Sequence, residues 1–467
     1  MLNSSQIVRL LGCSLLVLSG CRPVGPDHER PVLGLPASFS RGGMEWKRHT
    51  EPCAPVRRAW WKLYADGVLT SLVERALAGN QEIAASAARL RQARELSQVV
   101  RSAYFPQIDL GRQVSRSKTR RPGSGGVSIV ESRFVVPVDF SYEVDMWGKL
   151  RRQVESASAT AEAADDGHQA QRLSVAGEVA QTYWALRAVD ADRAVLTRTL
   201  EIRRKALDLL TKSQAAGSIS GLDLARATTE VASVEAARIR LDQDRMELVN
   251  ALAVLVGVPA TGFSVPENHE LPAPPSVPVS LPSELLRQRP DIRAAERRVA
   301  AANADIGVAT AAFYPSFSIN ASSGLSAAAM GDLFQASSLI WSIGSNTTLP
   351  ITQGKRFQSQ KRAAEAAHAA ASADYRQTVL TSVGEVETAL QGACLLERRQ
   401  LAQDQALAAA RKTLDLSMKR FQSGLVSFLD MVDAERTRLE AEKAANAIRA
   451  ERLALSVSLI KALGGEW

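Results

Sequence analysis

The second half of this chain repeats the first, and this repeat constrains the fold more than any other feature of the sequence. SVAGEVAQTYWAL resembles TSVGEVETALQGA, and AAGSISGLDLARATTEV resembles FQSGLVSFLDMVDAERT. Three pairs of aligned glycines are each 207 positions apart: Gly177 and Gly384, Gly217 and Gly424, Gly257 and Gly464. We therefore expect one elongated unit built twice, and not the roughly three domains that a chain of this length suggests.

Each repeat has the same predicted order of elements. A helix is followed by two strands joined by a Gly/Ser-rich loop, and then by two very long helices joined by a short turn that contains glycine. PENHELPAPPSVPVSLP is typical of a linker and separates the repeats. The predicted segments are a signal peptide (1–20), an N-terminal segment (21–67), a first repeat (68–256, strands 105–116 and 133–146), a connector (257–282), a second repeat (283–463, strands 315–325 and 339–351) and a tail (464–467).

The first 21 residues are typical of a bacterial lipoprotein signal. Arg9 precedes an apolar run, 10–18, that is too short to span a membrane. Leu-Ser-Gly-Cys, ending at Cys21, resembles the lipobox, in which the cysteine is acylated and becomes the new N-terminus. Arg22 follows, where an Asp would favour retention at the inner membrane, so the outer membrane is favoured. The alternative is an ordinary signal peptide with an incidental cysteine.

Four segments alternate apolar and polar residues as strands do. In FVVPVDFSYEVDM the even positions from Phe134 to Met146 are apolar and the odd ones mostly polar; 317–321 and 339–343 alternate likewise, and 108–114 more weakly. Spans of about 10 residues with one apolar face suit a transmembrane β-barrel, and an ordinary half-buried sheet is the alternative. Because the smallest membrane barrels have about eight strands, four strands require a barrel shared by two or three protomers.

The long helices carry a coiled-coil rhythm. Residues of one series recur every three or four positions from Leu186 to Leu210, and this series includes Arg193 and Arg203. An uninterrupted helix over 151–214 would reach about 95 Å. The heptads alone do not distinguish a hollow helical tube from a rigid spacer.

Charge and motifs argue against several function classes. The net charge is +8, but Lys and Arg alternate with Asp and Glu along the helices, so we do not expect nucleic-acid binding. The five histidines show no metal-ligand spacing, and no phosphate-binding loop or nucleophile motif is present, so we expect no enzyme, no metal and no cofactor other than the lipid on Cys21. The sequence leaves open whether Cys53 and Cys394 form a disulfide.

Four segments together resemble a known family: GCRPVGPDHERP, WWKLYADGVLTSLVERALAGN, SYEVDMWGKLRRQVE and LRQRPDIRAAERRVAAANADIGVATAAFYPSFSI. They are similar to the TolC-like outer-membrane factors, and most to the OprM-type lipoprotein branch of resistance–nodulation–division (RND) efflux systems. The resemblance covers 21–464. It implies a homotrimer whose 12-stranded barrel, four strands per protomer, is continuous with a coiled-coil α-barrel in the periplasm. It also implies a mixed equatorial belt from 46–64, 257–282 and the tail.

The resemblance further implies a gate at the periplasmic tip. Asp430 and Asp433 are three apart on a helix that starts after Gly424, so they share one face, and in the family an Asp-x-x-Asp lines the closed end. The matching positions of the first repeat are Asp223 and Arg226, so Arg226 could pair with either aspartate. Three protomers would bring six carboxylates together, which should raise some of their pKa values and attract cations. The alternative is that the two aspartates only solubilise an exposed helix end.

Two positions near the tip depart from the family pattern. Phe421 stands where some relatives have Tyr, and Val426 where some have Arg, so the gating bonds of those relatives are not carried over. The residues expected to form the tips on which a periplasmic adaptor (membrane fusion protein) docks are Gly217, Ser218, Gly424 and Leu425.

The function that the resemblance implies is passive. An inner-membrane RND transporter would supply the energy, and the duct would conduct small molecules such as drugs and toxic compounds to the exterior. The alternatives are a type I protein-secretion duct and a periplasmic coiled-coil adaptor lipoprotein without a channel.

Overall fold

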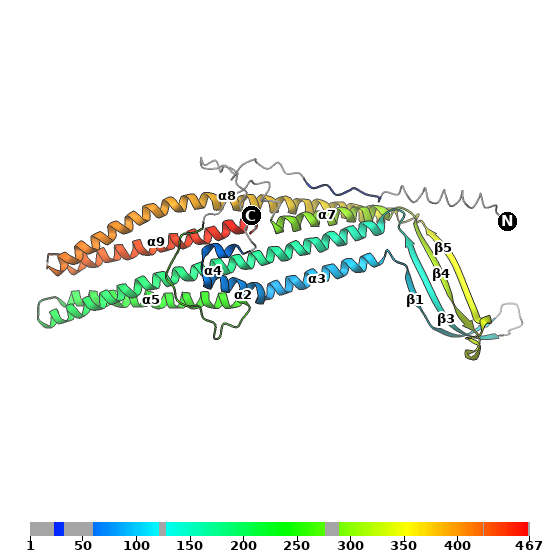
Figure 1. Cartoon of the computed structure of the whole chain (residues 1–467), viewed down its shortest axis with the longest axis horizontal. Coiled ribbons are helices and arrows are strands. Elements are labelled where there is room, and N and C mark those ends of the chain that lie inside the picture. Colours follow the sequence, from blue (N-terminus) through cyan, green and yellow to red (C-terminus); the bar gives the residue numbers. More distant parts are fainter. Residues whose placement is uncertain (1–22, 32–58, 121–127, 276–288, 424, 466–467) are drawn as a thin grey trace. The chain divides into compact units, whose positions relative to one another are not determined.

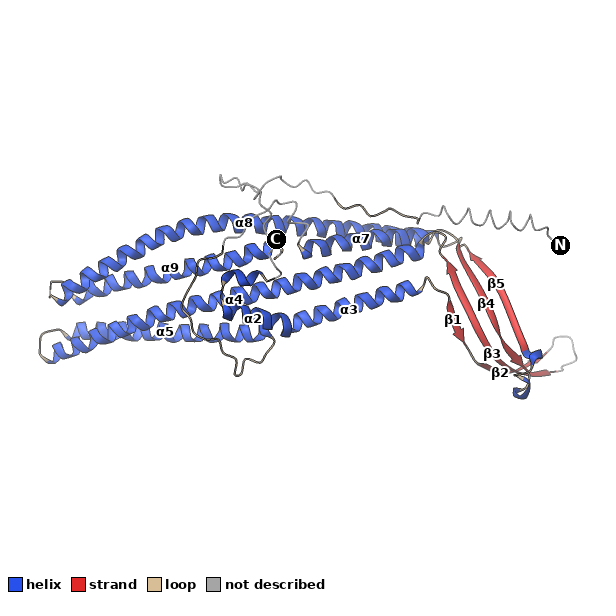
Figure 2. Cartoon of the chain, in the orientation of Figure 1, coloured by secondary structure: helices blue, strands red, loops and turns tan. Residues whose placement is uncertain are grey.

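The structure is a computed structural model that describes residues 23–31, 59–120, 128–275, 289–423 and 425–465. These residues form two compact units, whose parts are coloured along the sequence in Figure 1. The described parts of the first unit lie within Met1–Val32, Arg89–Asp165 and Ala294–Arg376, and those of the second within Leu33–Ala88, Asp166–Arg293 and Gln377–Trp467. The expected mixture of long helices and a sheet is confirmed (Figure 2).

Seven α-helices are described, and two of them are very long. They are α2 (Gly67–Gly79), α3 (Gln81–Ser102), α4 (Lys149–Ala215), α5 (Gly221–Val256), α7 (Pro290–Ala311), α8 (Gly354–Gln422) and α9 (Phe428–Ala462). Helices α4 and α8 have 67 and 69 residues. The expected uninterrupted helix over 151–214 therefore lies within α4. None of the described helices is long and apolar enough to cross a membrane.

The single helix expected before the strands of the first repeat is two helices, α2 and α3, and Asn80 separates them. The backbone of Asn80 is extended, with φ −66° and ψ 129°. Its side-chain oxygen accepts hydrogen bonds from the amides of Glu82 (2.9 Å) and Ile83 (3.1 Å), which caps α3. Its side-chain nitrogen donates to the carbonyl of Leu255 (2.8 Å), so the break is held by a residue from the far end of α5.

The strands form one antiparallel sheet in the first unit. They are β1 (Gln107–Leu110), β2 (Gln113–Arg120), β3 (Ser128–Val144), β4 (Ser316–Ala327) and β5 (Leu339–Thr348). The order is β1-β3-β4-β5, and β2 also pairs with β3. Leu110 lies opposite Val138 and Gln113 opposite Val135, so β1 and β2 follow one register as a single interrupted strand. The sheet thus has four strand positions, at the segments where alternation was found.

The pairing register gives the sheet one apolar and one polar face. Ile108 is opposite Phe140, which is opposite Ala321, which is in turn opposite Ile343, and side chains on paired positions share a face. The same face carries Leu110 and Trp341, which are 75% and 74% exposed. The other face carries polar residues from all four positions, among them Gln107, Asp109, Asp139, Ser141, Asn320, Ser322, Ser342 and Asn346.

The main hydrophobic core lies in the second unit and surrounds the middle of α4. Trp60, Trp61 and Tyr64, in a short 3-10 helix (η1, Trp60–Tyr64), are buried with Tyr183 and Trp184 of α4. The Tyr64 and Trp184 ring centroids are 5.4 Å apart. Residues of α2, α5 and α9 and of the connector, such as Val265, complete the cluster. The described parts of 46–64 and 257–282, two of the segments expected to form a belt, thus contribute side chains to this core, while Trp46 lies outside the described residues.

Candidate functional site

The two long helical hairpins of the second unit end in similar turns. In the α4–α5 turn, Gly217 has φ +73°, a conformation that favours glycine, and the Ser218 amide donates to the Ser213 carbonyl (3.0 Å). In the α8–α9 turn the Leu425 amide donates to the Arg420 carbonyl (2.9 Å). Ser218 and Leu425 are thus at the tips, as expected from the sequence, whereas Gly424 lies outside the described residues.

The aspartates that begin the two following helices bind the residues that cap those helices. The Ser427 hydroxyl and amide both donate to Asp430 (2.7 and 3.0 Å), while the Asp430 amide donates back to the hydroxyl (3.2 Å). These bonds stabilise the carboxylate, so they lower the pKa of Asp430 below its ordinary value. Ser220 and Asp223 form the related arrangement in the first hairpin, with the Ser220 hydroxyl 2.9 Å from the carboxylate of Asp223.

Arg226 and Asp433, the other charged residues expected at the gate beside Asp223 and Asp430, are both exposed. Arg226 lies 3.9 Å from Asp223, on its own helix. Among the described residues, no ion pair within the chain joins Arg226 to Asp430 or Asp433, so such a pair remains a prediction for contacts between protomers. The expected rise in the pKa of these aspartates by crowding also remains a prediction for the assembled protomers. In the single chain, the pKa of Asp430 is lowered.

Phe421 contacts Phe428 across the turn. The two ring centroids are 6.1 Å apart and the rings are tilted by 56°. Both side chains are half-buried, at the end of α8 and the start of α9. Phe421 therefore packs within its own hairpin.

A buried ion cluster further along the helices was not predicted as a site. Arg203 of α4 is bonded to the carboxylates of Glu230 on α5 and Glu435 on α9, the latter at 3.0 Å. Arg203 and Glu435 are only 6% and 1% exposed. Burial raises the pKa of the Glu435 carboxyl above its ordinary value, and the nearby Arg203 offsets only part of that rise. This cluster, Arg203–Glu230–Glu435, is a buried polar link between the first hairpin and the second, and Arg436 of α9 also pairs with Glu230 at 3.1 Å.

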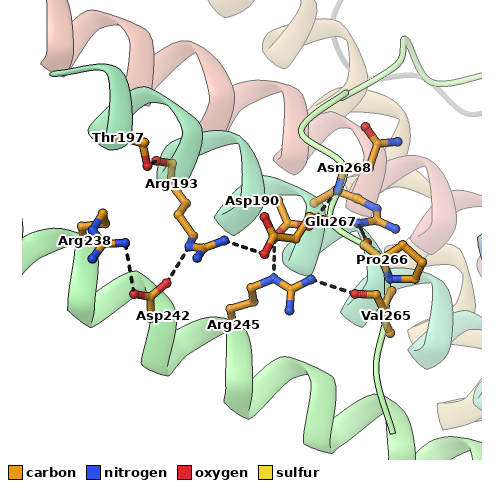
Figure 3. A network of polar contacts seen from close by, with 11 residues as sticks. Asp190, Arg193, Thr197, Arg238, Asp242, Arg245, Val265, Pro266, Glu267 and Asn268 are labelled. Carbon is orange, nitrogen blue, oxygen red and sulfur yellow. Dashed lines mark hydrogen bonds and ion pairs between the residues drawn. The ribbon is translucent and has the colours of Figure 1, made fainter. Parts of the chain in front are cut away.

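A second polar network holds the connector against the first hairpin (Figure 3). Arg245 of α5 donates to Asp190 of α4 (2.7 Å) and to the carbonyl of Val265 (2.8 Å). Arg193 is bonded to Asp242 (2.5 Å) and Glu267 (2.8 Å). Both Arg193 and Arg203 belong to the heptad series of α4. The other positions in this series are mostly apolar. An arginine at such a position was the sequence signal that could have pointed to both networks.

The chain that follows the predicted lipidation site is held in the first unit. Cys21 itself lies outside the described residues. The Val24 amide donates to the carbonyl of Trp147 (3.0 Å), and Arg152 of α4 donates to Asp27 (2.7 Å). A Cβ on Gly148 would lie 2.6 Å from the Cα of Pro23. The segment 23–27 thus lies against the junction where β3 ends and α4 begins.

Within the part of the chain that the structure describes, no group of three His, Cys, Asp or Glu side chains could hold a metal ion. Cys394 is half-buried and forms no disulfide with a described residue, and Cys53 lies outside the described residues.

Comparison with known proteins identifies the class. The family model of the outer membrane efflux proteins matches residues 72–258 and 281–465, and this chain belongs to that family. It is 32% identical over 417 residues to the pyoverdine export outer membrane protein OpmQ of Pseudomonas aeruginosa, covering 88% of each chain. It is 29% identical over 465 residues to the solvent efflux pump outer membrane protein SrpC of Pseudomonas putida, covering 97% of each.

Solved structures agree with this assignment. The outer-membrane channel OprN superimposes with a TM-score of 0.87 at 30% identity, covering 95% of this chain and 99% of that one. The open state of the MtrE channel of Neisseria gonorrhoeae gives 0.81 at 27% identity, covering 95% and 98%. The predicted family, the efflux function and the outer-membrane location are confirmed. A periplasmic adaptor without a channel is thereby excluded.

Proposed function

We propose that three protomers of this chain form one outer-membrane duct, with a 12-stranded barrel in the membrane and an α-barrel below it. The observation that carries this proposal is the two-faced sheet with open edges. One protomer leaves β5 on one edge and the interrupted strand β1/β2 on the other, and open edges do not occur in lipid. Its exposed apolar face, with Trp341 and Ile343, suits lipid, and its polar face suits a water-filled lumen.

The count of three rests on the family resemblance. Two protomers would supply eight strand positions and three would supply twelve, and both can close a barrel. The two matches of the family model, at 72–258 and 281–465, support the duplication within each protomer. Native mass spectrometry of the detergent-solubilised protein should give three times the chain mass. A mass of one or two chains would contradict the trimer.

The cargo is proposed to be small molecules driven by a separate pump. The relatives are named for the export of pyoverdine and of solvents, which favours small compounds over secreted proteins. An inner-membrane RND transporter would supply the energy, and a periplasmic adaptor would dock on the tips at Gly217, Ser218, Gly424 and Leu425. The duct would then be passive. Ala substitution of Ser218 and Leu425, both exposed, should weaken adaptor binding without changing the mass of the trimer.

The resting gate is proposed to be the ring of Asp430 and Asp433 from three protomers. Both side chains are exposed at the start of α9, where a shared axis would bring six carboxylates together. Asp223, Arg226 and Phe421 would surround this ring from the neighbouring hairpins. Conductance of the reconstituted duct tests the gate, because neutralising the ring should change the resting current and its preference for cations.

The covalent lipid on Cys21 is proposed as a second membrane anchor. Two residue steps separate Cys21 from Pro23, which is at most about 7 Å of chain. Because Pro23 lies against Gly148, at the junction of β3 and α4, the acyl chains would enter the leaflet at the helical end of the sheet. Mass spectrometry of the mature N-terminus tests this, and an unmodified Cys21 would contradict it.

A further inference from the structure

The charged residues of the strands are sorted between the two faces of the sheet. Every acidic residue of the five described strands lies on the polar face: Asp109, Glu131, Asp139 and Glu143. The apolar face has three cations and no anion, and the cations are consecutive on that face of β2: Arg116, Lys118 and Arg120. All three are exposed, and no described residue forms an ion pair with them.

These three cations lie at one end of the apolar face. On β3, the residues opposite them are Ser132, Val130 and Ser128, and the next pair towards the helices is the apolar pair Val114 and Phe134. From Phe134 the apolar face continues to Val144, ten residues further along β3. On β2, the face therefore changes from apolar to basic between Val114 and Arg116.

The length of the apolar face matches the thickness of a membrane. Ten residues of strand extend about 34 Å, or about 26 Å along the membrane normal at a tilt of about 40°, and apolar bands of outer-membrane barrels are about 25 Å tall. If Val144, where α4 follows, marks the periplasmic boundary, Phe134 marks the outer one. Arg116, Lys118 and Arg120 are two, four and six residues beyond that level, so they lie about 5, 10 and 16 Å outside the boundary, from the level of the lipid headgroups outward.

We propose that Arg116, Lys118 and Arg120 form a binding site for the phosphate groups of an anionic lipid in the outer leaflet. The inference rests on the proposed function, because it requires the apolar face to contact lipid. Guanidinium and ammonium groups bind phosphate through charge-assisted hydrogen bonds, and arginine does so with two parallel bonds. At the midplane of the bilayer, cations on the lipid-facing side would destabilise the inserted barrel. At the level of the headgroups, this free-energy cost falls almost to zero.

The structure supplies a matched control on the opposite face. Arg133 of β3 lies opposite Ser115, next to the level of Arg116, but on the polar face. Its side chain donates to the Ser326 hydroxyl (3.2 Å). Removing Arg133 changes the charge by one at nearly the same height without touching the lipid-facing side.

The experiment uses the full-length protein in phosphatidylethanolamine vesicles that contain either diphosphorylated lipid A or the same lipid with its phosphates removed. The temperature at which the SDS-resistant assembly dissociates is measured, together with the lipid affinity. For the wild type we expect a higher dissociation temperature with the phosphorylated lipid. The triple variant Arg116→Ser/Lys118→Ser/Arg120→Ser should lose this difference, and its affinity should fall by about fivefold per cation, on the order of a hundredfold in all.

Arg133→Ser should retain the difference, and so should Arg116→Lys/Arg120→Lys, which keeps the charge. A triple variant that keeps the wild-type difference would overturn the site. So would a triple variant that destabilises the assembly equally in both vesicles, because the cations would then bind another protein group, such as Asp332 in the β4–β5 connection of a neighbouring protomer. An assembly that never forms in any vesicle would overturn the proposed barrel and this site with it.

Discussion

The two hairpin tips have nearly the same backbone and very different charges. Both turns close with an amide that donates to a carbonyl five residues earlier, and both following helices begin at a serine that binds an aspartate three residues on. In the first tip, Asp223 has Arg226 at 3.9 Å. In the second, Asp430 is followed by Asp433. The turn geometry therefore depends on a few serine and glycine positions, and the charge of each tip is free to serve another purpose.

The same contrast continues along the helices. Arg203 of the first hairpin has Ala410 at the position 207 residues later, and Glu435 of the second has Thr228 at the position 207 residues earlier. The buried cluster is therefore contributed unequally, with an arginine from one hairpin and a carboxylate from the other. Because one hairpin contributes the cation and the other the carboxylate, the two can form an ion pair with each other. Two hairpins of identical sequence would place like charges at the contact.

Removing Arg203 should weaken the contact between the two hairpins the most. Arg203→Ala would leave Glu435 buried without its cation, which costs about 3–5 kcal/mol in comparable sites. Hydrogen exchange of the α9 amides near Glu435 should therefore accelerate strongly. Arg204→Ala is the matched control, since Arg204 pairs with Glu235 at the surface and should cost at most about 1 kcal/mol. Equal effects of the two variants would show that the buried cluster does not hold the hairpins together.

Neutralising the second tip should change conduction more than stability. Asn in place of Asp430 and Asp433 keeps a hydrogen-bond acceptor for Ser427 and removes six charges from a trimer. We expect the resting conductance to rise several-fold and the preference for cations to fall, because the carboxylates no longer bind cations at the constriction. Planar-bilayer recordings measure both quantities. Asp223→Asn, at the matching position of the first tip, should change them less, and an equal change would contradict the assignment of the gate to the second tip.

The serine caps should show a smaller difference between the tips. Ser427 and Asp430 form a full capping box, with bonds in both directions, whereas Ser220 caps α5 through one backbone bond. Ser→Ala at a helix N-cap costs about 1 kcal/mol. We expect Ser427→Ala to loosen the first turn of α9 more than Ser220→Ala loosens that of α5, as measured by hydrogen exchange at the tips. The opposite ranking would show that the second box is not the stronger cap.

The features that follow from local patterns could be predicted from the sequence. The alternation of β3 and β4 and the glycine-bearing turns are local, so the strands and the tips are at the expected segments. The break at Asn80 was missed because it depends on a carbonyl of Leu255, 175 residues away. The partners of Arg203 were missed for the same reason, since heptad spacing gives the face of a helix but not which helix lies opposite.

Glu435→Gln should have the smallest effect, and its pH dependence separates charge from packing. Glutamine keeps an oxygen that can accept the bond from Arg203, and it removes a carboxylate whose pKa is raised by burial. An acid with a raised pKa in the folded state binds more protons there than in the open state, so the wild-type cluster gains stability as the pH falls through that pKa. Glu435→Gln should therefore cost less than about 1 kcal/mol at pH 7 and abolish that gain. Hydrogen exchange of α9 between pH 5 and 8, corrected for the intrinsic rate, measures this, with Glu235→Gln on the exposed pair as the control. If Glu435→Gln were as destabilising as Arg203→Ala at every pH, the charge on Glu435 would itself be the main stabilising contact between the hairpins.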